Sequence, residues 1–507
     1  FAILAALATP ALAQTPPASR DHYSCATYQV PLDHRRPAAG TIGLALLRRA
    51  ADDQAHRIGS LFLNPGGPGG SGLLMPARLD GDLPAEVTTR FDLVGFDPRG
   101  VGASTPLRCF ATQEQANEVA GQRVEVPVTS AEIAATLAAN RAHTDACAVN
   151  AGQLLEHMST QEVARDLDLL RRAVGDRSLN FLGYSYGTLL GATYANLFPR
   201  YTRAIVLDGN VDPVLRTRDG LEYLRQRAVG QEAVLDSYLA LCARTGPGCV
   251  FGTGGDPAAK FAELRTRLRQ GPVEVPELGP LTLSMFVNGV AGNLYQPVQF
   301  PVLAEALQLV YQAAYPTSAA RAASPGASAG VSAAVRDWFA TAATGAGGRI
   351  DQRPWAGADT PYLGNDSPLG VNCTDEPFPA DPARFPRAAD QWEARAPTTG
   401  RVHAFNQVAC ATWPVRHPQR FSGPFDRRTA TPVLLFGNYY DPATTYRFNL
   451  RMAAALGSAR LVSVDGYGHT IVGGLSACAD AAATRYLVDL VLPPAGTVCH
   501  PDRQPFA

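Results

Sequence analysis

Ser185 lies at the centre of a Gly-x-Ser-x-Gly segment, residues 183–187, whose residue types could support nucleophilic catalysis. The run 178–182 before it predicts a buried strand, and the residues after it begin a helix pattern. A sharp turn between a strand and a helix lifts a serine hydroxyl off a sheet, and glycines flank the serine because a Cβ would clash there. We therefore predict that Ser185 is a nucleophile. The alternative is an ordinary tight turn between a strand and a helix.

The same template occurs a second time, at residues 326–330. This copy lies in a tract rich in alanine, glycine and serine, residues 318–348, and no strand pattern precedes it. We interpret the second copy as a chance match.

A serine hydroxyl is a weak nucleophile at neutral pH, so the prediction requires a histidine that accepts its proton. When the serine follows a strand in this way, the chain order is serine, acid, histidine. Only His469 and His500 follow the strand pattern that begins at Val433. His469 lies in a glycine-flanked loop directly after a further strand pattern, whereas His500 lies near the tail. We favour His469 as the general base; the alternative for either residue is a surface imidazole.

A carboxylate must orient the imidazole. Asp441 comes at the carboxyl end of the strand pattern 433–436 and before His469. Two other carboxylates compete, because Asp208 also ends a strand pattern and Asp465 is close to the histidine in the chain. Both fit the shaping of a turn better than the orienting role. We therefore predict Asp441 as the orienting acid.

A glycine-rich loop, residues 64–72, follows the strand pattern 60–63 and contains a Gly-x-Gly-x-x-Gly string typical of dinucleotide sites. Such a site must open a continuous helix whose N-terminus meets the pyrophosphate. Pro76, Gly81 and Pro84 interrupt any helix here. We therefore favour an oxyanion hole, a set of N–H groups that stabilises a developing negative charge.

Within this loop the oxyanion prediction falls on two glycines. Pro65 and Pro68 have no N–H, which leaves Gly66 and Gly67 as donors. A third glycine-containing segment, residues 95–104, predicts only a turn after a strand, which an Asp–Arg pair within it could brace.

Composition excludes several classes of protein. The chain has 507 residues with a net charge of −1, whereas partners such as nucleic acid or an anionic membrane surface require a basic excess. Nine cysteines include no Cys-x-x-Cys pair and no Cys/His cluster at zinc spacing. We expect no metal and no cofactor.

The elements that must position these residues alternate between short apolar runs and longer amphipathic ones. Several runs are continuously apolar, as expected of strands buried on both faces of a mostly parallel sheet. One helix is well marked at residues 159–174, where Ser159 and Glu162 form a capping box. The fold class is therefore α/β. The predicted strands are 41–47, 60–63, 91–96, 178–182, 204–207, 433–436 and 460–464.

The strand rhythm stops after Asp208 and resumes only at about Pro432, and the residues between are richer in helix patterns. A long, mainly helical insertion between two parts of one sheet is the simplest account, and we interpret it as a lid. The predicted organisation is a core at 21–212, a lid at 213–428 and the rest of the core at 429–507.

Residues 1–13 form an apolar run that ends in an Ala-x-Ala pattern and resembles part of a secretory signal peptide. The run is shorter than the roughly 18 to 20 apolar residues that span a bilayer. We expect a secreted or envelope protein without a membrane span, and an exported protein can keep disulfides.

Several motifs together resemble the secreted tripeptidyl aminopeptidases, within the proline iminopeptidase-like serine peptidases of the α/β-hydrolase fold. The resemblance covers most of the chain. It rests on residues 64–72 (NPGGPGGSG), 95–104 (GFDPRGVGAS), 183–187 (GYSYG), 435–446 (LFGNYYDPATTY) and 463–470 (SVDGYGHT).

The resemblance implies Ser185 as nucleophile, His469 as base and Asp441 as orienter, with the N–H groups of Gly67 and Tyr186 as oxyanion donors. It also implies release of short peptides from free N-termini, which calls for carboxylates that bind the substrate ammonium. Asp375 and Glu376 match a segment typical of the family; the alternative is that they are solvated loop acids.

Proximity and the same resemblance suggest four disulfides. They are Cys109–Cys147, Cys242–Cys249, Cys373–Cys410 and Cys478–Cys499, with Cys25 left over. We therefore expect a secreted serine exopeptidase that releases di- or tripeptides. The alternatives are a carboxylesterase or lipase of the same fold, and a catalytically silent envelope binding protein.

Overall fold

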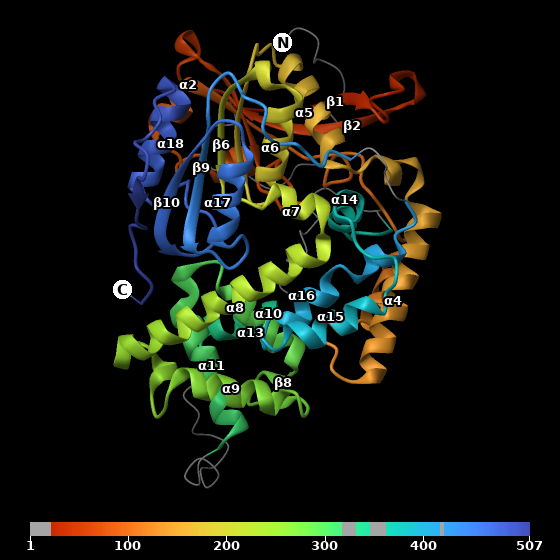
Figure 1. Cartoon of the computed structure of the whole chain (residues 1–507), viewed down its shortest axis with the longest axis vertical. Helices are drawn as coiled ribbons and strands as arrows, with labels where there is room; N and C mark the ends of the chain where they lie inside the picture. The colour runs from red at the N-terminus through yellow and green to blue at the C-terminus, as the bar shows by residue number, and fades with distance from the viewer. Residues whose placement is uncertain (1–21, 317–330, 345–360, 416–419, 507) are drawn as a thin grey trace.

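The computed structural model describes residues 22–316, 331–344, 361–415 and 420–506 (Figure 1). The expected signal segment 1–13 and the second Gly-x-Ser-x-Gly copy at 326–330 lie outside the described residues, as does much of the tract 318–348.

Nine strands form one mixed sheet in the order β1-β2-β4-β3-β5-β6-β9-β10-β11. The first two pairings, β1 with β2 and β2 with β4, are antiparallel, and every later pairing is parallel. All seven predicted strands are confirmed. The sheet consists of β1 (Tyr23–Pro31), β2 (Thr41–Arg49), β3 (Gly59–Asn64), β4 (Phe91–Phe96), β5 (Leu179–Tyr184), β6 (Thr202–Asp208), β9 (Val433–Tyr440), β10 (Ala459–Tyr467) and β11 (Val498–Cys499).

Helices cover both faces of this sheet, so every residue of β3, β4 and β5 is buried. Side chains alternate between the two faces along each strand. Phe62 packs in the cluster that contains α5 (Thr160–Ala173), α6 (Gly187–Leu197) and α17 (Tyr446–Ala455). Its neighbours Leu61 and Leu63 pack in the cluster that contains α2 (Ala85–Arg90) and α18 (Ala477–Asp489). The α/β architecture predicted from the apolar runs is therefore present.

The capping box predicted for α5 forms only in part. The Ser159 hydroxyl accepts the N–H of Glu162 at 3.3 Å, as an N-cap should. The Glu162 carboxylate does not return to the backbone of Ser159; instead, one of its oxygens lies 3.7 Å from the Arg99 guanidinium.

The predicted brace between Asp97 and Arg99 is wrong. Arg99 is fully buried and forms a bidentate pair with Asp166 of α5, with N–O distances of 2.8 and 2.7 Å. It also donates to the carbonyl oxygens of Leu32 and His157. Asp97 instead accepts hydrogen bonds from groups on either side of it in the chain, which are the Ser71 hydroxyl and the N–H groups of Leu73 and Ala103.

The described residues between β6 and β9 are mainly helical, and most of them lie below the sheet in the view of Figure 1. A short hairpin of β7 (Val273–Val275) and β8 (Gly279–Leu281) interrupts them. No helix of the described ranges is long and apolar enough to cross a bilayer. The helices are α7 (Pro213–Arg218), α8 (Gly220–Thr245), α9 (Pro257–Leu268), α10 (Leu283–Asn293), α11 (Phe300–Ala314), α13 (Ala333–Thr344), α14 (Ser367–Asp375), α15 (Arg384–Trp392) and α16 (Gly400–Asn406).

An earlier part of the chain also packs against this helical region. Val126 belongs to the apolar cluster of α8, α9, α10 and α11. Ile133 and Leu137, on α4 (Ser130–Asn150), pack against the cluster formed by α8, α15 and α16. The region 213–428 therefore does not build its core alone.

All four predicted disulfides are present, and Cys25 is the free, exposed cysteine. Two of them join segments 38 and 37 residues apart in the chain: Cys109–Cys147 links the segment after β4 to the end of α4, and Cys373–Cys410 ties α14 to the segment before β9. Disulfides of this kind are typical of proteins that fold outside the cytoplasm.

We predict that Arg99→Met lowers the free energy of unfolding by about 3–5 kcal/mol, because Asp166 and three backbone carbonyls would lose a buried partner. Urea denaturation measures this change. Arg141→Met is the matched control. Arg141 pairs with Asp145 on the surface, where the two side chains are 63% and 60% exposed, so its loss should cost less than about 1 kcal/mol. Equal costs for the two variants would contradict the prediction.

Candidate active site

Ser185 occupies a strained turn between β5 and α6. Its φ is +56°, in the left-handed region that L-residues rarely adopt. A Cβ on Gly183 would lie 2.6 Å from the carbonyl oxygen of Gly187, and a Cβ on Gly187 would lie 2.7 Å from the Asn64 side-chain oxygen. Both flanking glycines are therefore required by close contacts, as the predicted nucleophile elbow needs.

Asp441 and His469 leave neighbouring parallel strands, β9 and β10, and meet at the same edge of the sheet. The Nδ1 atom of His469 lies 2.9 Å from Oδ2 of Asp441 and 3.0 Å from Oδ1. Asp441 is 1% exposed, and its carboxylate also accepts the N–H groups of Ala443 and Thr444 and the Thr444 hydroxyl. Because Nδ1 faces the carboxylate, its proton belongs on Nδ1, which leaves Nε2 able to accept a proton.

The turn after β6 contacts both the serine and the histidine. The carbonyl oxygen of Asp208 accepts the N–H of Ser185 at 2.9 Å. A Cβ on Gly209 would lie 3.0 Å from Cε1 of His469, so the imidazole packs against this glycine. The structure thus places Ser185, Asp441 and His469 around one turn.

Two of the competing residues, His500 and Asp465, lie elsewhere. His500 and Asp465 face each other across 4.0 Å on the surface, with side chains 63% and 52% exposed. Such an exposed imidazole matches the alternative considered for His500.

The glycine-rich loop faces the serine turn. A Cβ on Gly66, whose φ is +91°, would lie 2.9 Å from the amide nitrogen of Tyr186. No continuous helix follows the loop, since α1 (Met75–Arg78) has four residues and ends before α2 begins. This interruption removes the helix N-terminus that a dinucleotide would need.

One part of the oxyanion prediction is wrong. The N–H of Gly66 donates to the Asn64 side-chain oxygen at 3.0 Å, so it is already committed. Among the hydrogen bonds of the described residues, none uses the N–H of Gly67 or of Tyr186. Those two groups keep the donor capacity that an oxyanion hole requires.

Asp375 is buried rather than solvated, with 2% exposure. Its Oδ2 accepts the N–H and the hydroxyl of Thr160 at 2.9 and 2.5 Å. The same hydroxyl lies 2.5 Å from the Tyr186 phenol oxygen, which connects Asp375 to the residue next to Ser185. Burial raises the pKa of Asp375 to about 6, although the Thr160 hydrogen bonds act in the opposite direction.

Glu376 is also buried but has a cationic partner. Its Oε1 lies 2.7 Å from the Arg216 guanidinium, and burial raises its pKa. Arg216 in turn stacks over the rings of Tyr186 and Tyr223. The alternative of two solvated loop acids is therefore wrong for both residues.

Asp375 and Glu376 are placed by α14, whose other end touches the glycine-rich loop. The Asn365 side chain donates to the carbonyl oxygen of Gly69 at 2.9 Å, and a Cβ on Gly69 would lie 2.7 Å from the Pro368 ring. The disulfide Cys373–Cys410 holds the helix near its carboxyl end.

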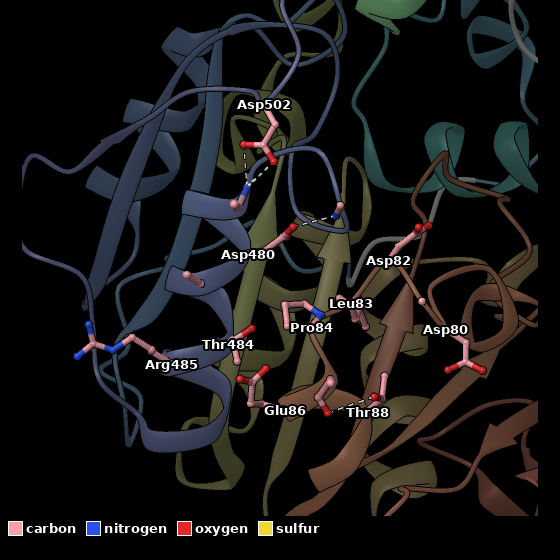
Figure 2. Close-up of a pocket in the computed structure, with 15 residues that line it drawn as sticks. Asp80, Asp82, Leu83, Pro84, Glu86, Thr88, Asp480, Thr484, Arg485 and Asp502 are labelled. Atoms are coloured by element: carbon pink, nitrogen blue, oxygen red, sulfur yellow. Dashed lines mark hydrogen bonds between the residues drawn. The ribbon is translucent and has the colours of Figure 1, made fainter.

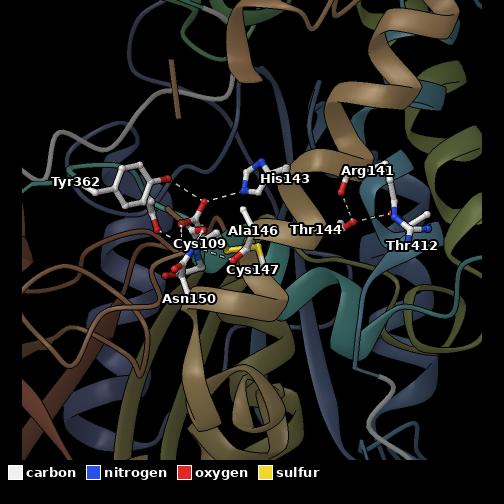
Figure 3. Close-up of a disulfide and its surroundings, with 12 residues drawn as sticks. Cys109, Arg141, His143, Thr144, Ala146, Cys147, Asn150, Tyr362 and Thr412 are labelled. Carbon is white, nitrogen blue, oxygen red and sulfur yellow. Dashed lines mark hydrogen bonds and ion pairs between the residues drawn. A yellow bond between two sulfur atoms is a disulfide. The ribbon is translucent and has the colours of Figure 1, made fainter. Parts of the chain in front are cut away.

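Two side-chain groups in the described ranges have metal-ligand spacing, and neither includes a predicted catalytic residue. In the first, Cys109 and Cys147 form a disulfide beside His143 (Figure 3), so they offer no thiolate. His143 and Tyr362 both contact the Asp366 carboxylate there. The second group, Asp33, His157 and Glu162, lies beside cationic arginines, with Arg36 on Asp33 and Arg99 near Glu162.

A cavity of about 770 Å³ lies between α2, α18 and the loop before α2 (Figure 2). Five of its fifteen lining residues are acidic, and none of the predicted catalytic residues belongs to it. Asp480 connects it with the loop after His469, because its carboxylate accepts the N–H groups of Gly473 and Gly474. The acidic lining residues are Asp80, Asp82, Glu86, Asp480 and Asp502.

Comparison with known proteins finds two family matches along the chain. The family described as alpha/beta hydrolase fold matches residues 59–245, and the family described as TAP-like protein matches residues 396–499. These ranges contain Ser185 in the first and Asp441 and His469 in the second.

Three curated proteins are similar over most of the chain. Serine protease Hip1 of Mycobacterium tuberculosis is 30% identical over 94% of this chain and 87% of its own length. Tripeptidyl aminopeptidase of Streptomyces lividans is 30% identical over 92% of this chain and 81% of its own. Carboxylesterase B of M. tuberculosis is 33% identical over 94% of this chain and 86% of its own.

We predict that Gly66→Ala slows labelling of Ser185 by a fluorophosphonate probe about 100-fold, because the new Cβ would lie 2.4 Å from the carbonyl oxygen of Tyr184 and displace the loop. Gly81→Ala is the matched control. Gly81 also has a positive φ, +115°, but a Cβ there meets nothing within 4 Å. Its labelling rate should stay within about twofold of the wild type. Undiminished labelling of Gly66→Ala, measured by intact-protein mass spectrometry, would refute the prediction.

Proposed function

The chain belongs to the family of α/β-hydrolase serine peptidases that includes the tripeptidyl aminopeptidases and Hip1, and from this premise we propose that it is a secreted exopeptidase. It releases di- or tripeptides from free peptide N-termini through an acyl-enzyme on Ser185. The observation that carries the proposal is the Asp441–His469 hydrogen bond, formed beside the strained turn that holds Ser185.

In the proposed reaction, Nε2 of His469 takes the Ser185 proton as the hydroxyl oxygen attacks the scissile carbonyl. Asp441 holds the tautomer and stabilises the imidazolium. The N–H groups of Gly67 and Tyr186 stabilise the tetrahedral oxyanion. His469 then protonates the leaving amine, and water releases the peptide from the serine by the reverse sequence of proton transfers.

Free N-termini are selected by a buried carboxylate at a fixed distance from the serine. Asp375 suits this role better than Glu376, because Arg216 already neutralises Glu376 whereas the hydrogen-bond partner of Asp375 is the neutral Thr160. A substrate ammonium would supply the missing countercharge. Arg216, which pairs with Glu376, stacks over the ring of Tyr186, the residue next to Ser185.

The proposed lid is the region 213–428, set between the core segments 21–212 and 429–507. It contributes α14, and hence Asp375, to the site. Secretion is supported by the four disulfides and by the apolar run 1–13 of the sequence.

An assay of free and N-acetylated tripeptidyl, dipeptidyl and aminoacyl anilides beside short acyl esters tests the proposal, with Ser185→Ala as the inactive reference. Free di- or tripeptidyl anilides should turn over at least tenfold faster than their acetylated forms, because acetylation removes the ammonium that pairs with Asp375. Faster turnover of esters than of any anilide would favour the esterase alternative, to which the similarity with carboxylesterase B also points. Equal turnover by Ser185→Ala would overturn the acyl-enzyme mechanism.

We predict that KM for a free tripeptidyl anilide rises as the pH falls below about 6. Because burial raises the pKa of Asp375 to about 6, its carboxylate is ionised above that pH and becomes protonated below it, which removes the charge that binds the ammonium. KM should increase about tenfold between pH 7 and pH 5. Asp375→Asn should show a raised KM that no longer varies over this range. A wild-type KM that stays constant from pH 7 to pH 5 would contradict the assignment.

A further inference from the structure

The loop that follows His469 is held by side-chain carboxylates. The N–H groups of Ile471 and Val472 both donate to Oδ2 of Asp208, at 2.7 and 2.8 Å. These two residues follow His469 after Thr470, which adopts a φ of +70°. Asp208 therefore anchors the backbone immediately beyond the imidazole.

The backbone carbonyl groups on either side of His469 are held by a different side chain. The Asn438 amide, near the end of β9, donates to the carbonyl oxygens of Gly468 and Thr470 at 2.8 and 3.1 Å. Asn438 holds carbonyl groups on both sides of His469, and Asp208 holds the next two N–H groups. Side chains from the neighbouring strands β9 and β6 thus hold the backbone around the histidine by hydrogen bonds.

Asp208 also contacts the nucleophile. Its carbonyl oxygen accepts the Ser185 N–H at 2.9 Å, while the next residue, Gly209, packs against the His469 ring. The main chain of Asp208 thus fixes the serine turn, and its side chain fixes the histidine loop. One residue sets the distance between two groups that must exchange a proton.

Burying the Asp208 carboxylate in the core costs desolvation free energy. The side chain is fully buried, and its Oδ1 has no hydrogen-bond partner among the described residues. Burial raises its pKa to about 7 against the effect of the two N–H groups. Titratable groups near it include Asp441 and His469. An apolar residue would avoid this desolvation but would leave two buried N–H groups unpaired.

We propose that Asp208 is a positioning residue that aligns His469 with Ser185 by binding the backbone N–H groups of residues 471 and 472. The inference rests on the proposed function, because it assigns Asp208 a role in the reaction of that serine and histidine. The role requires an acceptor oxygen at this place and no direct contact with substrate.

The test compares kcat and KM of Asp208→Ala and Asp208→Asn on the best anilide substrate. Asp208→Ala should lower kcat about 100-fold and leave KM within about threefold, because a displaced histidine affects proton transfer and not substrate binding. Asp208→Asn keeps an acceptor oxygen for both N–H groups, so it should restore kcat to within about tenfold of the wild type.

Asp480→Ala is the matched control. Asp480 accepts the next two N–H groups of the same loop, those of Gly473 and Gly474, at 2.8 and 2.9 Å. A purely structural role would make the two alanine variants alike in both melting temperature and kcat. We expect a comparable loss of melting temperature, with kcat of Asp480→Ala within about threefold of the wild type.

The outcomes separate this inference from the proposed function. If Ser185→Ala is inactive but folded Asp208→Ala keeps kcat within threefold of the wild type or of Asp480→Ala, the positioning role is refuted and the triad stands. If Ser185→Ala is as active as the wild type, the proposed function fails. If Asp208→Ala does not fold, the kcat of Asp208→Asn tests the proposal instead. A folded Asp208→Asn variant that is as inactive as Ser185→Ala would overturn the claim that a hydrogen-bond acceptor at this position is sufficient.

Discussion

Four adjacent parallel strands, β5, β6, β9 and β10, end at one edge of the sheet, and the arrangement of the site depends on this adjacency. Ser185, Asp441 and His469 lie just after β5, β9 and β10, and Asp208 is the last residue of β6. Loops at the carboxyl ends of parallel strands converge, which is why ligand and catalytic groups gather there in open α/β sheets. Short contacts such as those around Gly183 and Gly187 then only have to adjust positions that the strand order has already set.

Charge in this region is controlled mainly by backbone and neutral groups. Asp441 is held by N–H groups and a hydroxyl, and Asp375 by the N–H and hydroxyl of Thr160. Glu376 is the exception, since Arg216 neutralises it directly. Two consecutive carboxylates at the end of α14 therefore differ in what they can bind. A buried carboxylate without an ion-pair partner can still attract a cation, whereas a carboxylate already paired with an arginine cannot take a second one as readily.

The sequence predicted the central strands because the signals for them are local. It predicted Ser185, Asp441 and His469 as site residues for the same reason. Continuous apolar runs distinguish buried strands, and the turn after β5 needs particular glycines. The edge strand β1 was not predicted, because a single one of its residues, Val30, is fully buried and the remainder give no apolar run.

Errors arose where the hydrogen-bond partner of a group depends on the folded geometry, whether that partner is near or far in the chain. Asp97 and Arg99 are close in the chain, yet the partner of Arg99 is Asp166 on α5. Eliminating prolines left Gly66 as a donor, but the side chain of Asn64 occupies it. The packing of α4 against the helical region likewise has no local signal, and neither has the capture of the histidine loop by Asp208.

The pairing of β6 with β9 has a kinetic consequence. Val206 lies beside Leu434, although the whole helical region separates them in the chain. Closing so long a loop is entropically unfavourable before the strand contacts reward it. The apolar clusters of the helical region shorten that loop if they assemble first. The carboxyl edge of the sheet is then completed late, so that a chain still emerging from synthesis carries the Ser185 turn before Asp441 and His469 are in place.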